Sequence, residues 1–249
     1  MGIWKHFGKS GRRENKIKIY GKNNKICVFE DTEEVPLAEG EGIYGLEISV
    51  LGEGNIIRIS KSAVWSGCRL VIIGNGNLFD VGVGLIKQTS FVIQKSDNSR
   101  IVIGSDIFIG SGTFLIEEPE TFITIGRDCM FSDNITVRCS DGHPIYDKQG
   151  NIINRAYGIA IGNHVWLGCH VTVLKNVELA DDIVAGAGVA GKDHVQWTGC
   201  GCEATVIVRR SRNGCMAAIL PHRPYPGRSS GFCRLFSFLF RNFRRVGPE

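Results

Sequence analysis

Residues 161–190 have the sequence IGNHVWLGCHVTVLKNVELADDIVAGAGVA, and this stretch decides the fold. Divided into sixes, it gives IGNHVW, LGCHVT, VLKNVE, LADDIV and AGAGVA. The first place is aliphatic or Ala, the fifth is Val or Ile, and the second is Gly or Ala in four of the five hexads. A period of six fits neither the helical period of about 3.6 residues nor simple strand alternation. It predicts a solenoid in which each hexad forms one short strand and a corner.

The hexad frame extends towards the N-terminus with two interruptions. It places apolar residues at Ile103, Ile109, Leu115, Ile125, Phe131 and Val137. An acidic insertion, residues 117–120, divides this series, and a polar loop, residues 139–158, precedes Ile161. We expect three hexads to form one triangular coil of 18 residues. Each first-place aliphatic would then lie over its counterpart in the next coil, at the strand spacing of about 4.8 Å.

Residues 17–100 show the same alternation of strand and corner in a degenerate form. The short apolar runs are Ile17–Tyr20, Ile26–Phe29, Ile56–Ile59, Leu70–Ile73 and Phe91–Ile93. Corners rich in Asn and Gly separate many of them, and both residue types tolerate the positive φ of a tight corner. We interpret the region as irregular early coils of the same solenoid, with an independent β-sandwich as the alternative.

Composition excludes several classes of protein. The chain has 249 residues and a formal net charge of +4, which is too weak to indicate nucleic-acid binding. Its nine cysteines include no CxxC pair, which favours reduced thiols in a cytosolic protein. The first residues, MGIWKHFGKSGRR, contain no apolar core of the kind found in signal peptides, and no run approaches the roughly 20 apolar residues of a membrane span. We therefore expect a cytoplasmic protein.

The two ends of the chain differ from the middle. Residues 1–16 are basic and amphipathic, and we predict a cap on the solenoid rather than a frayed end. Residues 17–210 would form the solenoid domain and residues 211–249 a basic, aromatic tail. Within the tail, residues 231–245 have helical spacing of Phe and Leu. We favour a terminal helix packed on the solenoid or on a neighbouring copy, and the alternative is an interfacial helix lying on an anionic inner membrane.

A resemblance to a known family rests on two stretches. The hexads of 161–190, preceded by SDGHP at 140–144, resemble the left-handed β-helix acyltransferases, and in particular the galactoside and maltose acetyltransferases. The string DGHPIYDKQGNIIN followed by IGNHVWLGCHVTVLKNV is most similar to bacterial capsule and polysialic acid O-acetyltransferases. The resemblance is strong over 100–188, weaker over 17–100 and poor after residue 189. It implies an all-β fold, a left-handed parallel β-helix of hexapeptide repeats, with an extended catalytic loop and short terminal helices.

The same resemblance implies a reaction. Acetyl would pass directly from acetyl-coenzyme A to a sugar hydroxyl of a cell-surface polysaccharide. Such a hydroxyl is a poor nucleophile at neutral pH, and histidine is the usual general base. His143, between Gly142 and Pro144, matches the family's catalytic histidine. The alternative is an ordinary exposed loop histidine.

Further site residues are carried over from the family one by one. Trp166 matches a Trp near the thioester that can supply an oxyanion donor, with packing at a subunit contact as the alternative. Asn134 and Asp141 are candidates for binding the acceptor sugar, although Asn134 also suits a plain corner. With Trp166, the candidates for binding the coenzyme are Gly168, Gly186, Ala187, Gly188, Lys192 and, more loosely, Arg209. The family lays the pantetheine arm between adjacent solenoids, which implies a homotrimer with active sites at its subunit interfaces.

Two features of the sequence leave alternatives to this function and this site open. After residue 188 the family's pattern is one residue short and its Asn-Pro corner is missing, which suggests compensating frameshifts or an inactive copy. A non-catalytic scaffold is therefore one alternative function, and a xenobiotic acetyltransferase, which the composition does not exclude, is another. His164 and His170, six residues apart, would stack on one face and could join His143 in a zinc site, but we expect no metal. Nothing in residues 17–100 identifies the sugar.

Overall fold

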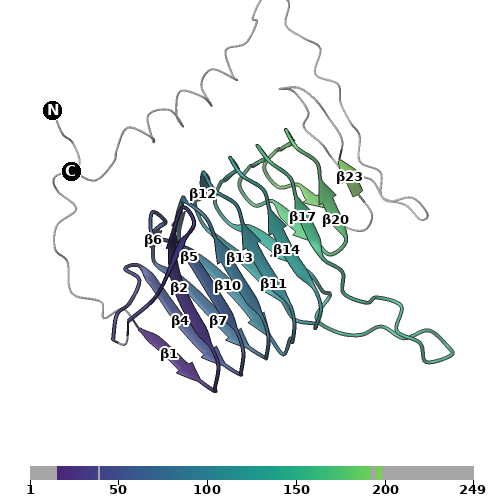
Figure 1. The fold of residues 1–249 in the computed structure, drawn as a ribbon. Helices are drawn as coiled ribbons and strands as arrows, with labels where there is room; N and C mark the ends of the chain where they lie inside the picture. The colour runs from purple at the N-terminus through teal and green to yellow at the C-terminus, as the bar shows by residue number, and fades with distance from the viewer. Residues whose placement is uncertain (1–15, 39, 192–194, 198–249) are drawn as a thin grey trace, which may run out of the picture.

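The described strands wind into a three-sided solenoid (Figure 1). The structure is a computed structural model that describes residues 16–38, 40–191 and 195–197. These residues form strands and corners without a helix, so none of their elements is a helix long and apolar enough to cross a membrane. The predicted left-handed parallel β-helix is confirmed. The terminal helices expected within 1–16 and 231–245 fall on residues outside these ranges, apart from Lys16.

Three sheets form the sides of the solenoid, and from β4 onward the chain gives one strand to sheets A, B and C in turn. Sheet A contains β1 (Ile17–Tyr20), β4 (Leu46–Leu51), β7 (Cys68–Ile73), β10 (Thr89–Gln94), β13 (Gly112–Ile116), β16 (Ile135–Arg138), β19 (Thr172–Leu174) and β22 (Ala190–Gly191). Sheet B contains β3 (Glu33–Pro36), β2 (Lys25–Glu30), β5 (Ile56–Ser60), β8 (Leu78–Val81), β11 (Arg100–Ile103), β14 (Phe122–Ile125), β17 (Ile159–Ile161), β20 (Val177–Leu179) and β23 (Val195–Trp197). Sheet C contains β6 (Val64–Ser66), β9 (Gly84–Lys87), β12 (Ile107–Ile109), β15 (Met130–Phe131), β18 (Trp166–Leu167) and β21 (Val184–Ala185).

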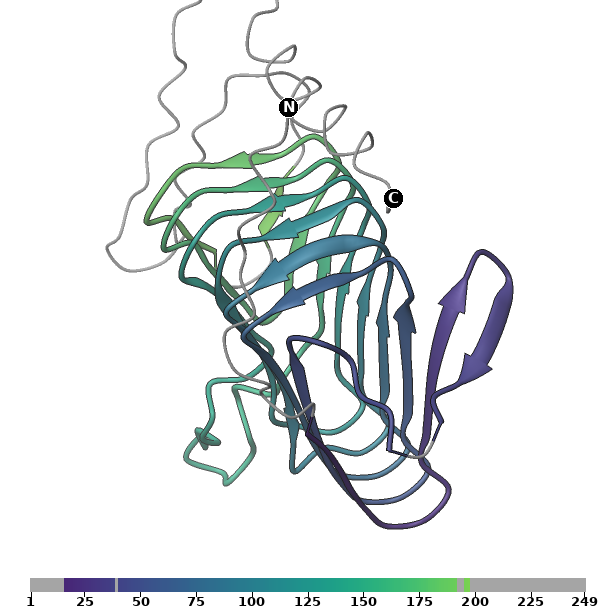
Figure 2. The same ribbon diagram turned by 90° about the vertical axis from the view of Figure 1, so that its left-hand side faces the viewer.

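Strands of neighbouring coils pair in parallel, with one exception at the N-terminal end. There β2 and β3 form an antiparallel hairpin that projects from the solenoid (Figure 2). All five apolar runs predicted in residues 17–100 lie in strands, namely β1, β2, β5, β7 and β10. The region is therefore the early part of the solenoid, and the sandwich alternative is wrong.

The hexads of 161–190 map directly onto the three sides. Ile161, Leu167 and Val173 are buried on sheets B, C and A, in that order. One coil later, Leu179 pairs in register with Ile161 and Ala185 with Leu167. The fourth place of each hexad has a positive φ and turns the corner; these residues are His164, His170, Asn176, Asp182 and Gly188.

The small second place of the hexad has a steric cause. A Cβ added to Gly168 would lie 2.8 Å from the backbone N of Ala187, one coil away. A Cβ on Gly162 would lie 2.7 Å from the carbonyl carbon of Ala180. The backbones of successive coils approach too closely here for a larger residue.

The predicted coil of 18 residues is correct only in the C-terminal part. His164 and its hydrogen-bond partner in the next coil, Asp182, are 18 residues apart. Asn55 and its partner in the next coil, Asn77, are 22 residues apart. The extra residues widen the corner between sheets A and B, and a buried column of polar side chains fills it. Asn77 Nδ2 donates to Asn55 Oδ1 at 3.1 Å, and Ser99 N donates to Asn77 Oδ1 at 2.9 Å. Because these amides satisfy one another, the corner can be wide without leaving buried polar groups unpaired.

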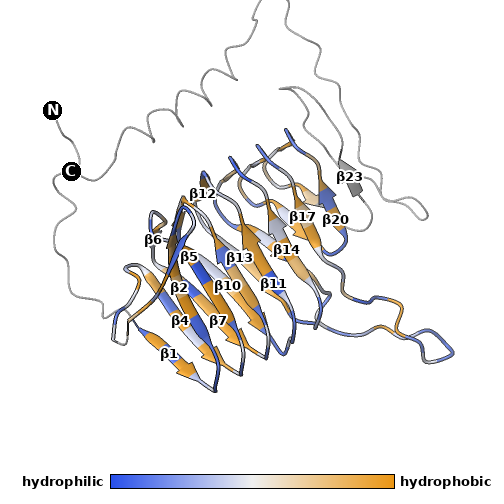
Figure 3. Ribbon diagram, viewed as in Figure 1, coloured by the Kyte–Doolittle hydropathy of each residue, from blue (hydrophilic) through white to orange (hydrophobic). Residues whose placement is uncertain are grey.

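The hexad frame also shifts within one coil, at the corner between β12 and β13. Leu115, predicted to point inward, is partly exposed, whereas its neighbours Phe114 and Ile116 are fully buried. Phe114 stacks on Phe91 of the previous coil with ring centroids 5.0 Å apart. The centre of the solenoid is therefore aromatic as well as aliphatic. Figure 3 shows apolar residues along the strands and more polar ones at many corners and along the loop of residues 139–158.

Candidate functional site

The loop of residues 139–158 leaves the solenoid between β16 and β17 and projects from it as an arm (Figure 1). It lengthens this one coil, so that residues stacked across it, such as Cys129 and Val165, are 36 apart. The arm has internal order. Tyr146 forms an antiparallel bridge with Ile152, and Ile153 N donates to the carbonyl of Ile145 at 2.8 Å. The interruption predicted from the hexad frame is thus a structured excursion at the corner between sheets A and B.

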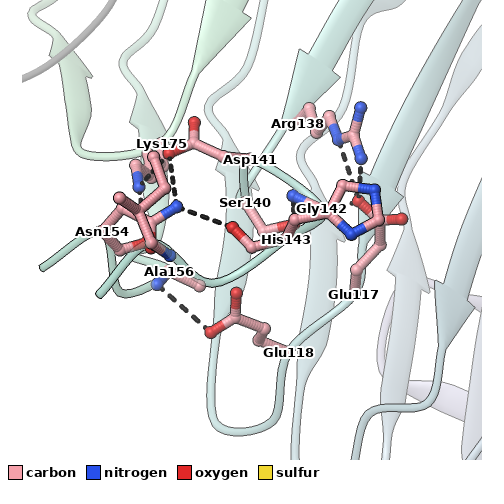
Figure 4. A network of polar contacts seen from close by, with 11 residues as sticks. Glu117, Glu118, Arg138, Ser140, Asp141, Gly142, His143, Asn154, Ala156 and Lys175 are labelled. Carbon is pink, nitrogen blue, oxygen red and sulfur yellow. Dashed lines mark hydrogen bonds and ion pairs between the residues drawn. The ribbon is translucent and has the colours of Figure 1, made fainter. Parts of the chain in front are cut away.

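Glu117 anchors the start of the loop (Figure 4). Its Oε2 accepts hydrogen bonds from Arg138 Nε at 2.8 Å and from Ser140 Oγ at 3.0 Å. Gly142 N donates to Ser140 Oγ at 3.1 Å and continues the chain of contacts. Burial opposes ionisation of the Glu117 carboxyl, but the hydrogen bonds from Arg138 and Ser140 outweigh it, and its pKa lies below the ordinary value. Glu117 therefore acts as an ionised anchor.

The end of the loop is held by Lys175, which follows β19 in the next coil. Lys175 Nζ donates to Asp141 Oδ2 and to the carbonyl of Asn154, both at 2.7 Å. Asn154 Nδ2 donates to Asp141 Oδ2 at 3.0 Å and to the carbonyl of His143 at 2.8 Å (Figure 4). Glu118 Oε2 also accepts a hydrogen bond of 3.3 Å from Ala156 N. Both flanks of His143 are therefore tied to the solenoid.

His143 itself is exposed, as a base must be if it is to reach a substrate. Gly142, directly before it, has a φ of 80°, and a Cβ there would lie against Arg138 Nη2. A glycine is required at this position both by the backbone conformation and by the packing. The Arg138 guanidinium thus packs against the backbone that leads to His143.

A second group of predicted residues lies at the corner between sheets C and A. Asn134, Gly168 and the stretch 186–188 occupy this corner in successive coils. Gly168 N donates to the carbonyl of Ala185 at 2.8 Å, and Gly188 N donates to the carbonyl of Cys169 at 2.9 Å. Asn134 is exposed and has a φ of 58°. Apart from Trp166, the predicted coenzyme residues that the structure describes are therefore neighbours in space.

This corner also holds a polar pair that the sequence did not indicate. Ser132 Oγ lies 3.0 Å from Cys169 Sγ, and this hydrogen bond holds the pKa of the Cys169 thiol below its ordinary value. Burial has the opposite effect on two other thiols, and raises the pKa values of Cys129 and Cys139 to about 12. Cys169 is only partly buried. Cys169 is thus expected to be the most nucleophilic of these three thiols.

Trp166 belongs to neither corner but to the outer face of sheet C. Register pairs place Val64, Leu85, Phe108, Met130, Trp166 and Val184 in one row, which we call the sheet C row. All six alternate with buried residues and face outward, with partial or full exposure. A continuous apolar row along an outer face favours a protein contact. This placement supports the packing interpretation of Trp166 beside the catalytic one.

A single chain does not bring all the predicted residues together. His143 and Asp141 lie at the corner between sheets A and B, whereas Asn134, Gly168 and the stretch 186–188 lie at the corner between sheets C and A. The width of sheet A separates the two corners. Lys192 and Arg209, predicted near the coenzyme, lie outside the described residues, as does most of the stretch after 189 where the family pattern fails.

The placement of the two histidines expected to share a face was wrong. Residues six apart lie on successive sides of the solenoid, so His164 turns the corner between sheets B and C, and His170 turns the next one. His164 Nδ1 lies 2.7 Å from Asp182 Oδ1. Among the described residues, no three His, Cys, Asp or Glu side chains are arranged to hold a metal ion.

The residues that anchor the loop were not predicted as such. Glu117 lies in the acidic insertion, residues 117–120, for which the sequence indicated no role. Lys175 lies in the hexad VLKNVE, and a lysine in the middle of a regular apolar repeat is the one sequence feature that could have drawn attention to it. Asn154 gave no signal, because asparagine is common in loops.

Comparison with known proteins now places this solenoid. No family model matches the sequence. The chain is 32% identical over 146 residues to a polysialic acid O-acetyltransferase of Neisseria meningitidis, a match that covers 50% of this chain and 67% of the relative. It is 31% identical over 96 residues to the galactoside O-acetyltransferase of Escherichia coli K12, covering 37% of this chain and 45% of that enzyme. The crystal structure of the polySia-specific acetyltransferase NeuO shares the fold, with a TM-score of 0.61 at 22% identity, over 93% of this chain and 94% of that one.

The fold and these matches define the class, an acyltransferase built on a left-handed β-helix. Within that class, the chain belongs to the O-acetyltransferase family that includes the polysialic acid O-acetyltransferases. The predicted family and the predicted type of enzyme are both confirmed.

Proposed function

We propose that this chain transfers acetyl from acetyl-coenzyme A to a sugar hydroxyl of a cell-surface polysaccharide, with His143 as the general base. The observation that carries the proposal is the exposed position of His143 on a loop whose two flanks are hydrogen-bonded to the solenoid. A base on a mobile tether would rarely be in place, whereas this one has an anchored backbone. The names of the relatives make an acidic capsule polysaccharide, polysialic acid, the first acceptor to test.

The proposed reaction is a direct transfer. His143 takes the proton of the acceptor hydroxyl as its oxygen attacks the thioester carbonyl. The tetrahedral intermediate then collapses, the C–S bond breaks, and the departing coenzyme A thiolate receives the proton. The negative charge on the carbonyl oxygen requires a fixed hydrogen-bond donor. Trp166 Nε1 or a nearby backbone N–H is proposed for this role.

The proposed coenzyme site is the corner between sheets C and A. Gly168 and Gly186 are partly exposed at this corner, and Ala187 and Gly188 are exposed. Exposed backbone without bulky side chains suits the extended pantetheine arm, which carries two amides. Lys192 and Arg209 are proposed to contact its phosphates.

The separation of the two corners supports an active unit of more than one chain. We propose a homotrimer of parallel solenoids, in which the loop of residues 139–158 of each copy faces the corner between sheets C and A of its neighbour. The sheet C row offers an apolar surface for this contact. Its burial would also explain why Trp166 is placed on an outer face.

The test is acetyl transfer from radiolabelled acetyl-coenzyme A to a saccharide panel that includes polysialic acid, with products identified by mass spectrometry. For His143→Ala, we expect kcat to fall by about 10²–10⁴-fold, the usual loss for one general base, while coenzyme A binding survives. A near-wild-type rate in this variant would exclude His143 as the base. Absence of transfer by the wild type to every saccharide would instead favour the scaffold alternative.

His164→Ala is the matched control, because it removes a histidine at the corner between sheets B and C. We expect it to retain the wild-type rate. The same variant tests the zinc alternative, since stoichiometric zinc that is lost on this substitution would contradict the proposed metal-free reaction.

A further inference from the structure

Lys175 is a buried lysine at a corner of the solenoid. Its residue exposure is 4%, although lysine is rarely buried to this degree unless it is paired. It occupies the third place of its hexad, a place filled by Asn163, Cys169 and Asp181 in neighbouring hexads. A long cationic side chain is not needed to turn such a corner, so its presence calls for a separate cause.

The ammonium of Lys175 joins two points on the loop that are far apart in sequence. Asp141, 34 residues before it, lies near the start of the loop, and Asn154, 21 residues before it, lies near the end. Both hydrogen bonds are 2.7 Å long. The single side chain therefore closes the loop against the coil that follows it.

Asn154, whose carbonyl is bonded to Lys175, is itself hydrogen-bonded to the backbone of His143. The side chain of Asn154 contacts three alternate residues: its Nδ2 donates to Asp141 Oδ2 and to the carbonyl of His143, and its Oδ1 accepts from Ile145 N at 2.6 Å. One amide therefore holds the Asp141 side chain before His143 and the backbone that follows it, and the main chain of this Asn is itself held by Lys175 (Figure 4).

Direct contact of Lys175 with a substrate is excluded by its burial. Only 5% of its side chain is exposed, and its ammonium points into the loop rather than towards either outer face. The same network engages Oδ2 of Asp141, a residue predicted to bind the acceptor. In this arrangement the Asp141 carboxylate serves to hold the loop.

We propose that Lys175 is a positioning residue, which acts through Asp141 and Asn154 to set the place of the His143 imidazole in the transfer reaction. The inference rests on the proposed function of His143 as base. A displacement of about 1 Å in a reacting group can cost about 10²-fold in rate. Loss of the anchor should therefore lower kcat more than it weakens the binding of either substrate.

The variant to make is Lys175→Met, which keeps the length of the side chain and removes the ammonium. Rates are measured per folded enzyme, well below the melting temperature of the variant, so that a loss of stability is not counted as a loss of activity. We expect kcat to fall by about 10- to 100-fold, with the KM values for acetyl-coenzyme A and acceptor changed by less than about threefold. Lys148→Met, an exposed lysine at the tip of the same arm, is the control and should keep the wild-type rate.

Two further variants separate positioning from a purely structural role. Lys175→Arg retains a cation and should recover part of the lost kcat. The double variant, Asp141→Asn with Lys175→Met, should have a kcat no lower than that of the slower single variant. Both residues act through the same anchor, so their effects should not add. If Lys175→Met keeps its kcat per folded enzyme, or loses affinity with kcat unchanged, the positioning role is wrong.

Hydrogen exchange gives a readout that does not depend on activity. The amides of Ile145 and Ile153 should exchange faster in Lys175→Met than in wild type, because their hydrogen bonds depend on the closed loop. Unchanged exchange would overturn the anchor even if the wild type proves inactive. Faster exchange in an enzyme that transfers no acetyl group would contradict the proposed function and leave the anchor in place.

Discussion

Ser132 Oγ lies 3.0 Å from Cys169 Sγ across two coils of the corner between sheets C and A. Since the hydroxyl lowers the pKa of this thiol, Cys169 should react with iodoacetamide at neutral pH while Cys129 and Cys139 stay protected. Peptide mapping by mass spectrometry measures the rate at each site. Ser132→Ala should slow the reaction at Cys169 by about two- to tenfold.

The same thiol reports on the proposed coenzyme site. Gly188 N is hydrogen-bonded to the carbonyl of Cys169, so a coenzyme lying along the stretch 186–188 would cover the thiol. Saturating coenzyme A should therefore protect Cys169 from alkylation, whereas an equal concentration of adenosine should not. Equal labelling with and without coenzyme A would move the proposed coenzyme site away from this corner.

Acid should release the start of the loop of residues 139–158. The pKa of Glu117 in the folded protein lies below its ordinary value of 4.5, which means that ionisation of this carboxyl stabilises the fold. This stabilisation is complete above about pH 4.5 and is lost as the pH falls through the lower folded pKa. As the pH is lowered from 7, the melting temperature of Glu117→Gln should fall less than that of wild type. The variant has no carboxylate at this position that acid could protonate. A pH dependence identical to that of wild type would show that Glu117 is not an ionised anchor.

The aromatic stack should dominate the stability of the central coils. Phe114 is fully buried and stacks on Phe91, so Phe114→Ala should lower the free energy of unfolding by about 3–5 kcal/mol. Leu115→Ala, at the next position but facing outward, should cost far less. Chemical denaturation of the two variants measures the difference, and equal losses would contradict the inward orientation of Phe114.

The sheet C row should hold the proposed trimer together. Phe108→Glu places a charge in the middle of this row, and burying an unpaired carboxylate at a subunit contact is unfavourable. We expect light scattering to show monomers for Phe108→Glu and trimers for Val102→Glu, which adds the same charge to the outer side of β11 on sheet B. A trimer that survives Phe108→Glu would place the subunit contact on another face.

The sequence predicted the regular hexad positions correctly but not the places where the coils depart from the hexad frame. First-place residues such as Ile161 and Leu167 lie where the hexad frame put them, because each contact in the ladder repeats at one fixed separation. The frame failed at Leu115 because Ile109 and Phe114 pair with Phe131 and Val137 of the next coil, so the corner before Leu115 is one residue shorter than the corner stacked on it. The coils of 22 residues were not predicted either, because the pairing of Asn55 with Asn77 in the corner between sheets A and B is visible only in three dimensions.

The candidate site was predicted in part for the same reason. The interrupted frame pointed to the loop that bears His143. The anchors did not follow, because the contact of Lys175 with Asp141 spans 34 residues and that of Glu118 with Ala156 spans 38. Such contacts obey no sequence period, so they can be found only once the loop is folded against the coil.

The single long coil at residues 139–158 has a consequence for how such a loop could arise. Stacked residues across it are 36 apart, against 22 in the coils before it. The entropy of closing a chain segment grows only with the logarithm of its length, and a full doubling costs about 0.6 kcal/mol. Closing the longer segment at its base therefore adds little cost, and the arm's own hydrogen bonds act against the cost of ordering its residues. A repeat scaffold of this kind can lengthen, shorten or exchange its projecting loop during evolution while the ladder beneath it stays the same.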